Sequence, residues 1–391
     1  MSTAEINPFE WSDVPHGLFA ELRATCPVAK TQNGWYLASF DDVAEATKHV
    51  EVFSASFREA GVVVPDEEQF INEILEPRHG KIRKIINSTV AHHRAMQVEG
   101  FVRDLCNEYL DVILERGSGE LIGEFIAPLP VNVISHLIGV PRVDWSLFRG
   151  WSDEVVEGTY PTKYRNERGE GLAGAHPEFT RYIDTLIAER KAMTEPPDDL
   201  VTRLLTTEID DERLTDIEVR TQLVFLIISG NETTRHLIGN LFATVVGDPA
   251  LFARLKADRS LIERAVEESL RLDSPIHILL RNCLEPTEMF GVPMCPGEKV
   301  AFGIASANRD TSHHPEPDEF RLDRPNWRDH VAFGGGPHVC PGAALARLEA
   351  RVALDTFLDR VEQVRIAPGW LHRKAPVFWA NGPVDLPIEF G

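Results

Sequence analysis

Long apolar runs and an excess of positive charge are both missing from this 391-residue sequence. No stretch reaches the roughly 18 uninterrupted apolar residues that a membrane-spanning helix needs. The N-terminus has no basic start ahead of an apolar block, so we expect neither a signal peptide nor membrane attachment. Acidic residues outnumber basic ones by 61 to 40, giving a net charge of −21, which argues against binding to nucleic acid.

Paired cysteines are also missing. The sequence has five cysteines, an odd number, and no Cys-x-x-Cys pair, so they indicate reduced thiols rather than a disulfide framework. We therefore predict a cytoplasmic protein. The five positions are Cys26, Cys106, Cys283, Cys295 and Cys340.

The chain shows no internal repeat and no convincing linker, so we predict one domain over residues 1–391, mainly α with a minor β part. Helical patterns cover residues 107–115, 178–191 and 261–272, and strand-like runs cover 34–40, 276–280, 299–304 and 377–379. The Gly-rich stretch 158–176 could be a mobile lid or a domain boundary.

One predicted helix is unusually long. Thr215 and Glu218 form a capping box, and the helical pattern continues to Gly247, ahead of a proline. About thirty residues at 1.5 Å each give a rod of roughly 45 Å. Its apolar middle, residues 223–228, changes abruptly to Ser-Gly-Asn-Glu-Thr-Thr-Arg-His over 229–236, and such residues weaken a helix interior. A segment that destabilises the middle of a long helix indicates that its residues take part in the chemistry of the protein.

The most informative segment is Phe-Gly-Gly-Gly-Pro-His-Val-Cys-Pro-Gly-Ala-Ala-Leu-Ala, residues 333–346. Its glycines allow the backbone to pass close to a flat ligand, and Pro341 suits the first turn of the helix that follows. Because a helix N-terminus favours negative charge, we expect a lowered pKa for the Cys340 thiol and a metal-binding thiolate. The alternative is a buried structural cysteine. Cys295 also precedes Pro-Gly, but it lacks the glycines and the helix, so we assign it no ligand role.

At every fixed position this segment resembles the ligand loop of the cytochrome P450 family, Phe-Gly-x-Gly-x-His-x-Cys-x-Gly-x-x-Leu-Ala. The resemblance covers nearly the whole chain and implies the cytochrome P450 fold, a helix-rich triangular prism around a buried haem. It also implies haem b (iron protoporphyrin IX) as cofactor and Cys340 as the ligand of its iron. Phe333, His338 and Gly342 belong to the same cofactor-binding loop.

The middle of the long helix resembles the family's oxygen-activation motif, Ala/Gly-Gly-x-Asp/Glu-Thr, with Ser229 in place of the usual small apolar residue. The resemblance puts Gly230 at a helix distortion and makes Glu232 and Thr233 the acid and the alcohol of a proton relay. In the alternative interpretation, Glu232 only caps the helix or forms an ion pair with Arg235 or His236.

The haem has two propionates that need cationic partners. Positions that match the family are His79 and Arg83, four residues apart on one helix face, together with Arg281 and His338. Each alone could be a surface charge. Three further residues resemble the family's structural Glu-x-x-Arg element and its upstream arginine: Glu268, Arg271 and Arg324.

Two surfaces concern partners. Arg78, Lys81 and Lys84 form a basic patch that could dock an acidic electron donor such as a ferredoxin, or simply be a solvated helix face. No flavin or nicotinamide motif occurs, so electrons must come from a separate protein.

The expected substrate pocket is apolar, with His277 as its main polar residue, and favours a hydrophobic compound. Its apolar positions are Val62–Val64, Phe225, Leu226, Ile276, Ile278, Leu279, Val377 and Phe378.

The resemblance thus predicts a haem-thiolate monooxygenase that inserts one oxygen atom from O2 into a hydrophobic small molecule, such as a terpenoid, steroid or aromatic compound. Electrons would come from a ferredoxin and its reductase, and we expect a monomer. One alternative is a haem-thiolate binding or sensor protein without turnover, and another is a peroxide-driven peroxygenase. The intact pair Glu232 and Thr233 argues against both.

Overall fold

The structure is a computed structural model, and it describes residues 6–8, 11, 13–32, 34–56, 64–90, 96–157, 176–208 and 213–391. The stretch 158–176, expected to be a mobile lid or a domain boundary, lies outside this range except for His176. Two of the expected pocket residues, Val62 and Val63, also lie outside it.

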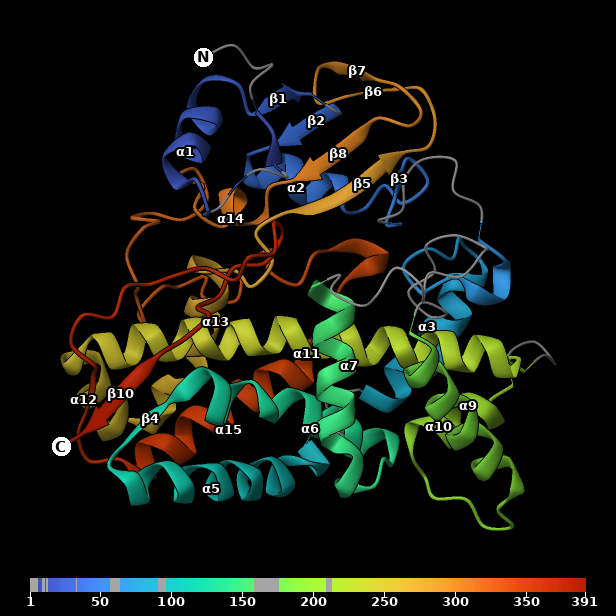
Figure 1. The fold of residues 1–391 in the computed structure, drawn as a ribbon. Helices are drawn as coiled ribbons and strands as arrows, with labels where there is room; N and C mark the ends of the chain where they lie inside the picture. The colour runs from blue at the N-terminus through green and yellow to red at the C-terminus, as the bar shows by residue number, and fades with distance from the viewer. Residues whose placement is uncertain are drawn as a thin grey trace.

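Helices make up most of the described chain, as the sequence predicts (Figure 1). The predicted helices over 107–115 and 178–191 lie within α5 and α9, and the third is α13, preceded by a 3-10 turn at Arg259–Leu261. The helices are α1 (His16–Thr25), α2 (Phe40–Ala46), α3 (Arg78–Val90), α5 (Glu99–Arg116), α6 (Pro128–Ile138), α7 (Trp145–Glu157), α9 (Pro177–Ala192), α10 (Leu200–Thr206), α11 (Asp216–Gly247), α12 (Pro249–Ala257), α13 (Ile262–Leu272), α14 (Ile304–Ala307) and α15 (Ala343–Arg360).

The strands form a small β part, most of which lies beside α1 and α2 in Figure 1. The largest sheet has the order β1-β2-β8-β5-β3, in which only β2 and β8 are parallel. Its strands are β1 (Val28–Thr31), β2 (Gly34–Leu37), β3 (Phe53–Ser54), β5 (Leu279–Cys283) and β8 (Lys299–Phe302). A second sheet has the order β4 (Ser118–Glu120), β10 (Pro387–Phe390), β9 (Val364–Ile366), and β6 (Thr287–Met289) pairs with β7 (Val292–Met294).

Two strand predictions need correction. The run at 377–379 is a turn, closed by the hydrogen bond from Ala380 N to Val377 O, and only Ala380 bridges to Ile276. Of the run 276–280, only the last two residues belong to β5. The apolar, β-branched and aromatic residues of both runs are partly buried, and Ile278 is fully buried, but burial does not require a ladder.

Helix α11 crosses the whole molecule in Figure 1. The capping box is confirmed: the Thr215 hydroxyl accepts from Glu218 N at 3.2 Å, and the Glu218 carboxylate accepts from Thr215 N at 2.8 Å. The helix ends at Gly247, where Asp248 caps α12. It packs against α6, α7, α9 and α15, so its length passes through the core.

Among the described helices, none taken singly has the length and apolar composition of a membrane span. Helices α11 and α12 meet that criterion only as a pair, and the pair is bent by 104°.

Candidate functional site

A cavity of about 290 Å³ lies between α11 and the loop that leads into α15. Eight of the residues that the sequence predicts for the site line it: Arg83, Gly230, Thr233, Arg281, Phe333, His338, Cys340 and Gly342. The other wall residues are mostly apolar and include Ala55, Ile71, Asn72, Pro130, Ile134, Phe225, Leu226, Ser229, Leu237, Ile276, Leu279, Leu345 and Glu349.

Cys340 is presented by a tight loop. Its N–H donates to Phe333 O at 2.9 Å, which closes the loop around the 3-10 turn Gly336–His338. Gly336 has φ 59°, and a Cβ there would lie 2.2 Å from the carbonyl oxygen of Thr47, so only glycine fits. The following helix begins at Ala343, so Pro341 precedes the first turn instead of lying in it.

The expected lowering of the Cys340 pKa is not what the polypeptide alone produces. Burial raises the pKa of this thiol, while the backbone N–H groups of Gly342 and Ala343 and the charges of Arg83 and Arg347 act in the opposite direction. The helix N-terminus therefore has the predicted sign, but desolvation outweighs it. A thiolate here needs a bound cation to stabilise it.

One edge of the cavity is cationic and lacks an anion. Burial lowers the pKa of Arg281 to about 10, and its hydrogen bond goes to the carbonyl of Leu280. Arg83 donates to Val339 O and Asn87. Within the part of the chain that the structure describes, neither guanidinium pairs with a carboxylate.

His338 lines this edge, and His79 lies against it without lining the cavity. The rings of His79 and His338 lie 4.4 Å apart, and Glu76 contacts His79 Nδ1 at 2.8 Å. His79 Nε2 and His338 Nδ1 are buried, with no hydrogen-bond partner among the described residues. Burial lowers the pKa of His338 to about 4, and the neighbouring His79, Arg281 and Arg83 act in the same direction. Such a cluster is costly unless an anion lies beside it.

On α11, Thr233 and Ser229 face the cavity. Each hydroxyl donates to the carbonyl four residues back: Thr233 Oγ1 to Ser229 O at 2.9 Å, and Ser229 Oγ to Phe225 O at 2.7 Å. We expected a helix distortion at Gly230, but it does not interrupt the helix: α11 continues unbroken from Asp216 to Gly247. The hydroxyls stay within the helix, so no carbonyl has to turn out of the ladder.

Glu232 is not part of the cavity wall. Its side chain is 3% exposed, forms an ion pair with Arg235 and contacts His236 Nε2 at 2.8 Å. Burial would raise the pKa of Glu232, but its two partners outweigh burial and hold this pKa below its usual range. The ion pair with Arg235 that the alternative interpretation expected is therefore present. The hydroxyl of the neighbouring Thr233 lines the cavity.

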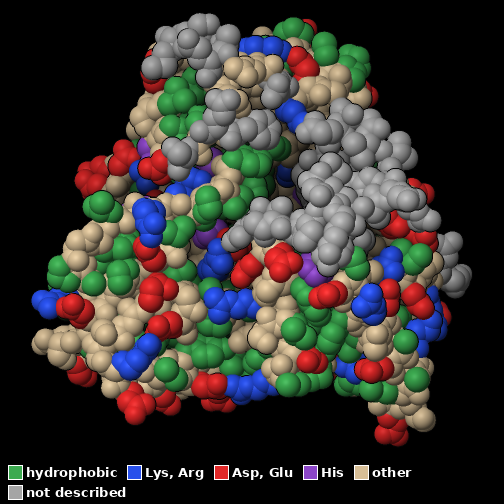
Figure 2. All heavy atoms as spheres, viewed as in Figure 1, with side chains coloured by type: hydrophobic (Ala, Val, Ile, Leu, Met, Phe, Trp, Pro, Cys, Tyr) green, Lys and Arg blue, Asp and Glu red, His purple; other side chains and the backbone are tan. Residues whose placement is uncertain are grey.

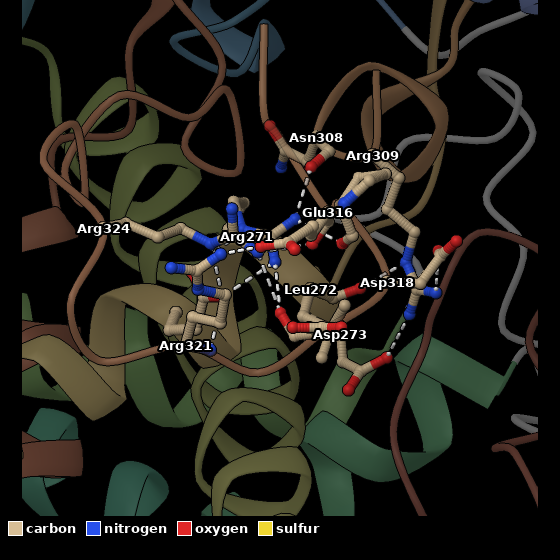
Figure 3. A network of polar contacts seen from close by, with 12 residues as sticks. Arg271, Leu272, Asp273, Asn308, Arg309, Glu316, Asp318, Arg321 and Arg324 are labelled. Atoms are coloured by element: carbon tan, nitrogen blue, oxygen red, sulfur yellow. Dashed lines mark hydrogen bonds and ion pairs between the residues drawn. The ribbon is translucent and has the colours of Figure 1, made fainter. Parts of the chain in front are cut away.

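Glu268 holds two arginines, Arg271 and Arg324, which belong to the polar network drawn in Figure 3. Arg271 donates to both of its carboxylate oxygens, at 2.8 and 2.9 Å, and Arg324 donates to Oε1 at 2.7 Å. All three side chains are at most 3% exposed. The arginines also donate to carbonyls of residues 308, 315, 316, 317 and 319, so this cluster fixes the segment ahead of the ligand loop.

The structure also corrects the expected substrate pocket. His277 does not line the cavity: its Nε2 contacts Phe378 O, and its ring lies 6.0 Å from that of Trp11. Asn72 and Glu349, polar residues that lie outside every motif, do line it. Burial raises the pKa of Glu349 to about 8. No motif marks either residue, because only packing places them at the wall.

These observations fit a flat, dianionic prosthetic group whose metal binds a thiolate. The cavity presents one thiol, Cys340, on an apolar wall, and its edge carries two arginines and two imidazole nitrogens that lack partners. Haem is such a group, with an iron that accepts thiolate and two propionates that pair with arginine and histidine. The site therefore has the features of a haem-thiolate protein.

Known proteins that are similar in sequence to this chain point to the same class. The model of the family described as "Cytochrome P450" matches residues 162–364. The Steroid C26-monooxygenase of Mycolicibacterium smegmatis is 31% identical over 373 residues, which cover 94% of this chain and 91% of that protein. Cytochrome P450 107B1 of Saccharopolyspora erythraea is 33% identical over 371 residues, or 90% and 89% of the two chains.

Solved structures agree over nearly the whole chain. Cytochrome P450 CYP109Q5 from Chondromyces apiculatus superposes with a TM-score of 0.86 at 32% identity and covers 99% of this chain and 97% of that one. CYP109E1 from Bacillus megaterium, in complex with testosterone, gives 0.84 at 30% identity and covers 99% and 100%.

This chain belongs to the cytochrome P450 family. It has the predicted fold, and it is a monooxygenase with a haem-thiolate cofactor that uses O2 and a redox partner.

Proposed function

We propose that residues 1–391 form one domain that holds haem b, with Cys340 as the iron ligand. Arg83 and Arg281 would bind the propionates, since their hydrogen bonds go to uncharged acceptors. His79 and His338 would assist through ring nitrogens that have no partner among the described residues. The loop residues Phe333 and Gly342 and the helix residue Gly230 would flank the ring. When bound, the haem supplies the iron at which O2 is activated. The observation that carries the proposal is that one thiol, two arginines without a carboxylate partner among the described residues and the His338 imidazole surround one cavity.

We propose that Thr233 and Glu232 move protons to this cavity. Thr233 donates its own proton to Ser229 O, so its oxygen is free to accept a hydrogen bond from a water or ligand in the cavity. Glu232 is the adjacent residue, and its carboxylate has two exchangeable partners, Arg235 and His236. Once released from these partners, the carboxylate would take up a proton from solvent and pass it on towards Thr233.

The variant Thr233→Ala should divert reducing equivalents from product to hydrogen peroxide, because the alcohol that orders the proton donor is lost. We expect product formation to fall by about 10²-fold, at the lower end of general acid–base contributions. Peroxide and product are measured per O2 consumed, with a surrogate ferredoxin system. Thr233→Ser keeps the hydroxyl and should retain most of the coupling. Unchanged coupling in the alanine variant would contradict the relay.

The substrate end of the cavity supports a hydrophobic compound with one hydrogen-bond donor. Its wall is apolar around Ile71, Phe225 and Leu226. Asn72 donates from Nδ2 to Ala55 O at 2.8 Å, and because that oxygen can only accept, the Asn72 carbonyl must point the other way. Asn72 Oδ1 is buried and has no partner among the described residues. A hydroxyl on a terpenoid, a steroid or an aromatic substrate would satisfy it.

Replacing Asn72 with leucine should remove a preference for hydroxylated ligands. We expect the wild type to bind 5α-androstan-17β-ol roughly tenfold more tightly than 5α-androstane, because one satisfied buried acceptor contributes about 1–1.5 kcal/mol. The ratio of the two dissociation constants, from titration of the ferric Soret band, should approach one in Asn72→Leu. Asn107→Leu, on α5 outside the cavity wall, is the control. An equal preference in Asn72→Leu and wild type would exclude this role.

We propose a ferredoxin as electron donor, although the basic patch on α3 is smaller than the sequence indicates. Arg78 forms an ion pair with Glu218 of α11, while Lys84 is exposed. Val339, next to Cys340, is 44% exposed and gives a short route from the surface to the ligand. Acidic and basic side chains are intermingled over the face in Figure 2. We further propose a cytoplasmic monomer that binds neither membrane nor nucleic acid.

The absorption spectrum of the dithionite-reduced protein under carbon monoxide tests this proposal. A strongly red-shifted Soret band means that a cysteine thiolate binds the iron, as the assignment of Cys340 requires. A band of the histidine-ligated type, or protein without haem, would overturn the assignment. Product formed with peroxide alone would favour the peroxygenase, and a correct spectrum without turnover would favour a sensor.

A further inference from the structure

A second buried carboxylate, Glu267, lies beside Glu268 on α13 and serves a different cluster. Its side chain is 1% exposed. Arg347 of α15 donates to it through Nε at 2.5 Å and through Nη2 at 2.9 Å, which is a bidentate contact. His330, ahead of the ligand loop, contacts Glu267 Oε2 through Nε2 at 2.8 Å. Glu267 therefore ties together α13, α15 and the start of the loop.

The protonation of His330 follows from its other ring nitrogen. Nδ1 accepts a hydrogen bond from the N–H of Ala332 at 3.3 Å, so it carries no proton. Nε2 must then hold the proton and donate it to Glu267. His330 is neutral in this arrangement, which leaves Arg347 as the cation that balances the Glu267 carboxylate.

Arg347 connects this ion pair to the ligand loop. Its guanidinium carbon lies over the Phe333 ring, 4.5 Å from the centroid. Phe333 lines the cavity, and its carbonyl accepts the N–H of Cys340. The charge of Arg347 also acts directly on the Cys340 thiol, in the direction that favours thiolate. Its side chain is 36% exposed, so the cation lies between solvent and the ligand loop.

We propose that Glu267, Arg347 and His330 are positioning residues that set the electrostatic environment of the cysteine ligand, with Glu267 partly neutralising the Arg347 cation. This inference rests on the proposed role of Cys340 as iron ligand. The inference predicts the sign of each variant's change in reduction potential. Reduction of the ferric haem-thiolate unit adds one negative charge, so a nearby cation stabilises the reduced form and raises the reduction potential. A nearby carboxylate lowers it.

Reduction potentials of single variants test this inference. Glu267→Gln keeps the shape and an acceptor oxygen but leaves Arg347 without its anion, so the potential should rise. Arg347→Gln removes the cation and leaves Glu267 with a neutral histidine, so the potential should fall. Arg347→Lys keeps the charge and should lie near wild type. Glu263→Gln is the control on the same helix, because Glu263 pairs with the exposed Arg328, where solvent screens the charge.

Opposite shifts in Glu267→Gln and Arg347→Gln support the inference, and the double variant should return towards the wild-type potential. Shifts of the same sign, or no shifts, would overturn it, since loosening of the loop would move both variants alike. If Glu267→Gln fails to fold, Arg347→Gln and Arg347→Lys still give the sign. The carbon monoxide spectrum of the wild type separates a failure of this inference from a failure of the Cys340 assignment.

Discussion

Replacing Cys340 with serine should abolish the red-shifted Soret band of the reduced carbon monoxide complex and, with it, monooxygenation. A serine hydroxyl is a neutral, weak ligand, whereas the thiolate donates the electron density that favours O–O cleavage. The rest of the site is unchanged in this variant, because the loop depends on the Cys340 N–H and on Gly336, and neither involves the side chain. Haem should therefore still bind through the cationic edge, in reduced amount.

The control is Cys295→Ser. Cys295 precedes the same Pro-Gly pair but is exposed, close to the β6–β7 hairpin. It should keep the wild-type spectrum and activity. A red-shifted band that persists in Cys340→Ser would show that another thiol binds the iron.

The ligand loop and α11 could be predicted from sequence because both depend on local chemistry. In the ligand loop, the glycine that approaches Thr47 and the cysteine ahead of the helix lie within a few residues of each other. The capping box of α11 likewise needs only Thr215 and Glu218, three residues apart. Their positions along the chain therefore fix their positions in space. The Glu268–Arg271 pair is local in the same sense, at three residues apart on α13.

Contacts between distant segments that no motif marks could not be predicted. Nothing in the sequence pairs Glu267 with Arg347, 80 residues away, or brings Asn72 to the cavity wall. His277 illustrates the reverse error: a polar residue between apolar neighbours suggested a pocket group, yet it bonds a carbonyl of the C-terminal segment. Side-chain direction at these positions is decided by packing across the fold, which no motif encodes.

The direction of the pKa shift at Cys340 was predicted wrongly for a related reason. A helix N-terminus can be seen in a sequence, but the degree of burial cannot, and burial shifts a thiol pKa upward by more than the helix lowers it here. Glu232 shows the opposite balance, since its two partners outweigh its burial. The sign of a shift in a buried site depends on which partners reach the group, and this requires the structure.

The variant Glu268→Gln should cause the largest loss of stability. Glu268 is the shared anion of two buried arginines, and its Oε1 also accepts the N–H of Arg321 at 2.9 Å. Its pKa lies below the usual range because these partners outweigh burial, so it is ionised at neutral pH. Without its charge, Arg271 and Arg324 remain buried without a carboxylate. Removing one partner of such a cluster costs about 3–5 kcal/mol.

Urea unfolding followed by far-ultraviolet circular dichroism measures that loss, and the haem content of the purified variant reports on the loop. Because both arginines hold carbonyls of residues 308–319 ahead of Cys340, haem retention should fall together with stability. Glu389→Gln is the matched control: its pair with Arg365 is solvent-exposed, and its loss should cost less than about 1 kcal/mol. Equal effects of the two substitutions would mean that the Glu268 cluster contributes no more than a surface ion pair, and that hydrophobic packing alone holds the loop beneath the cavity.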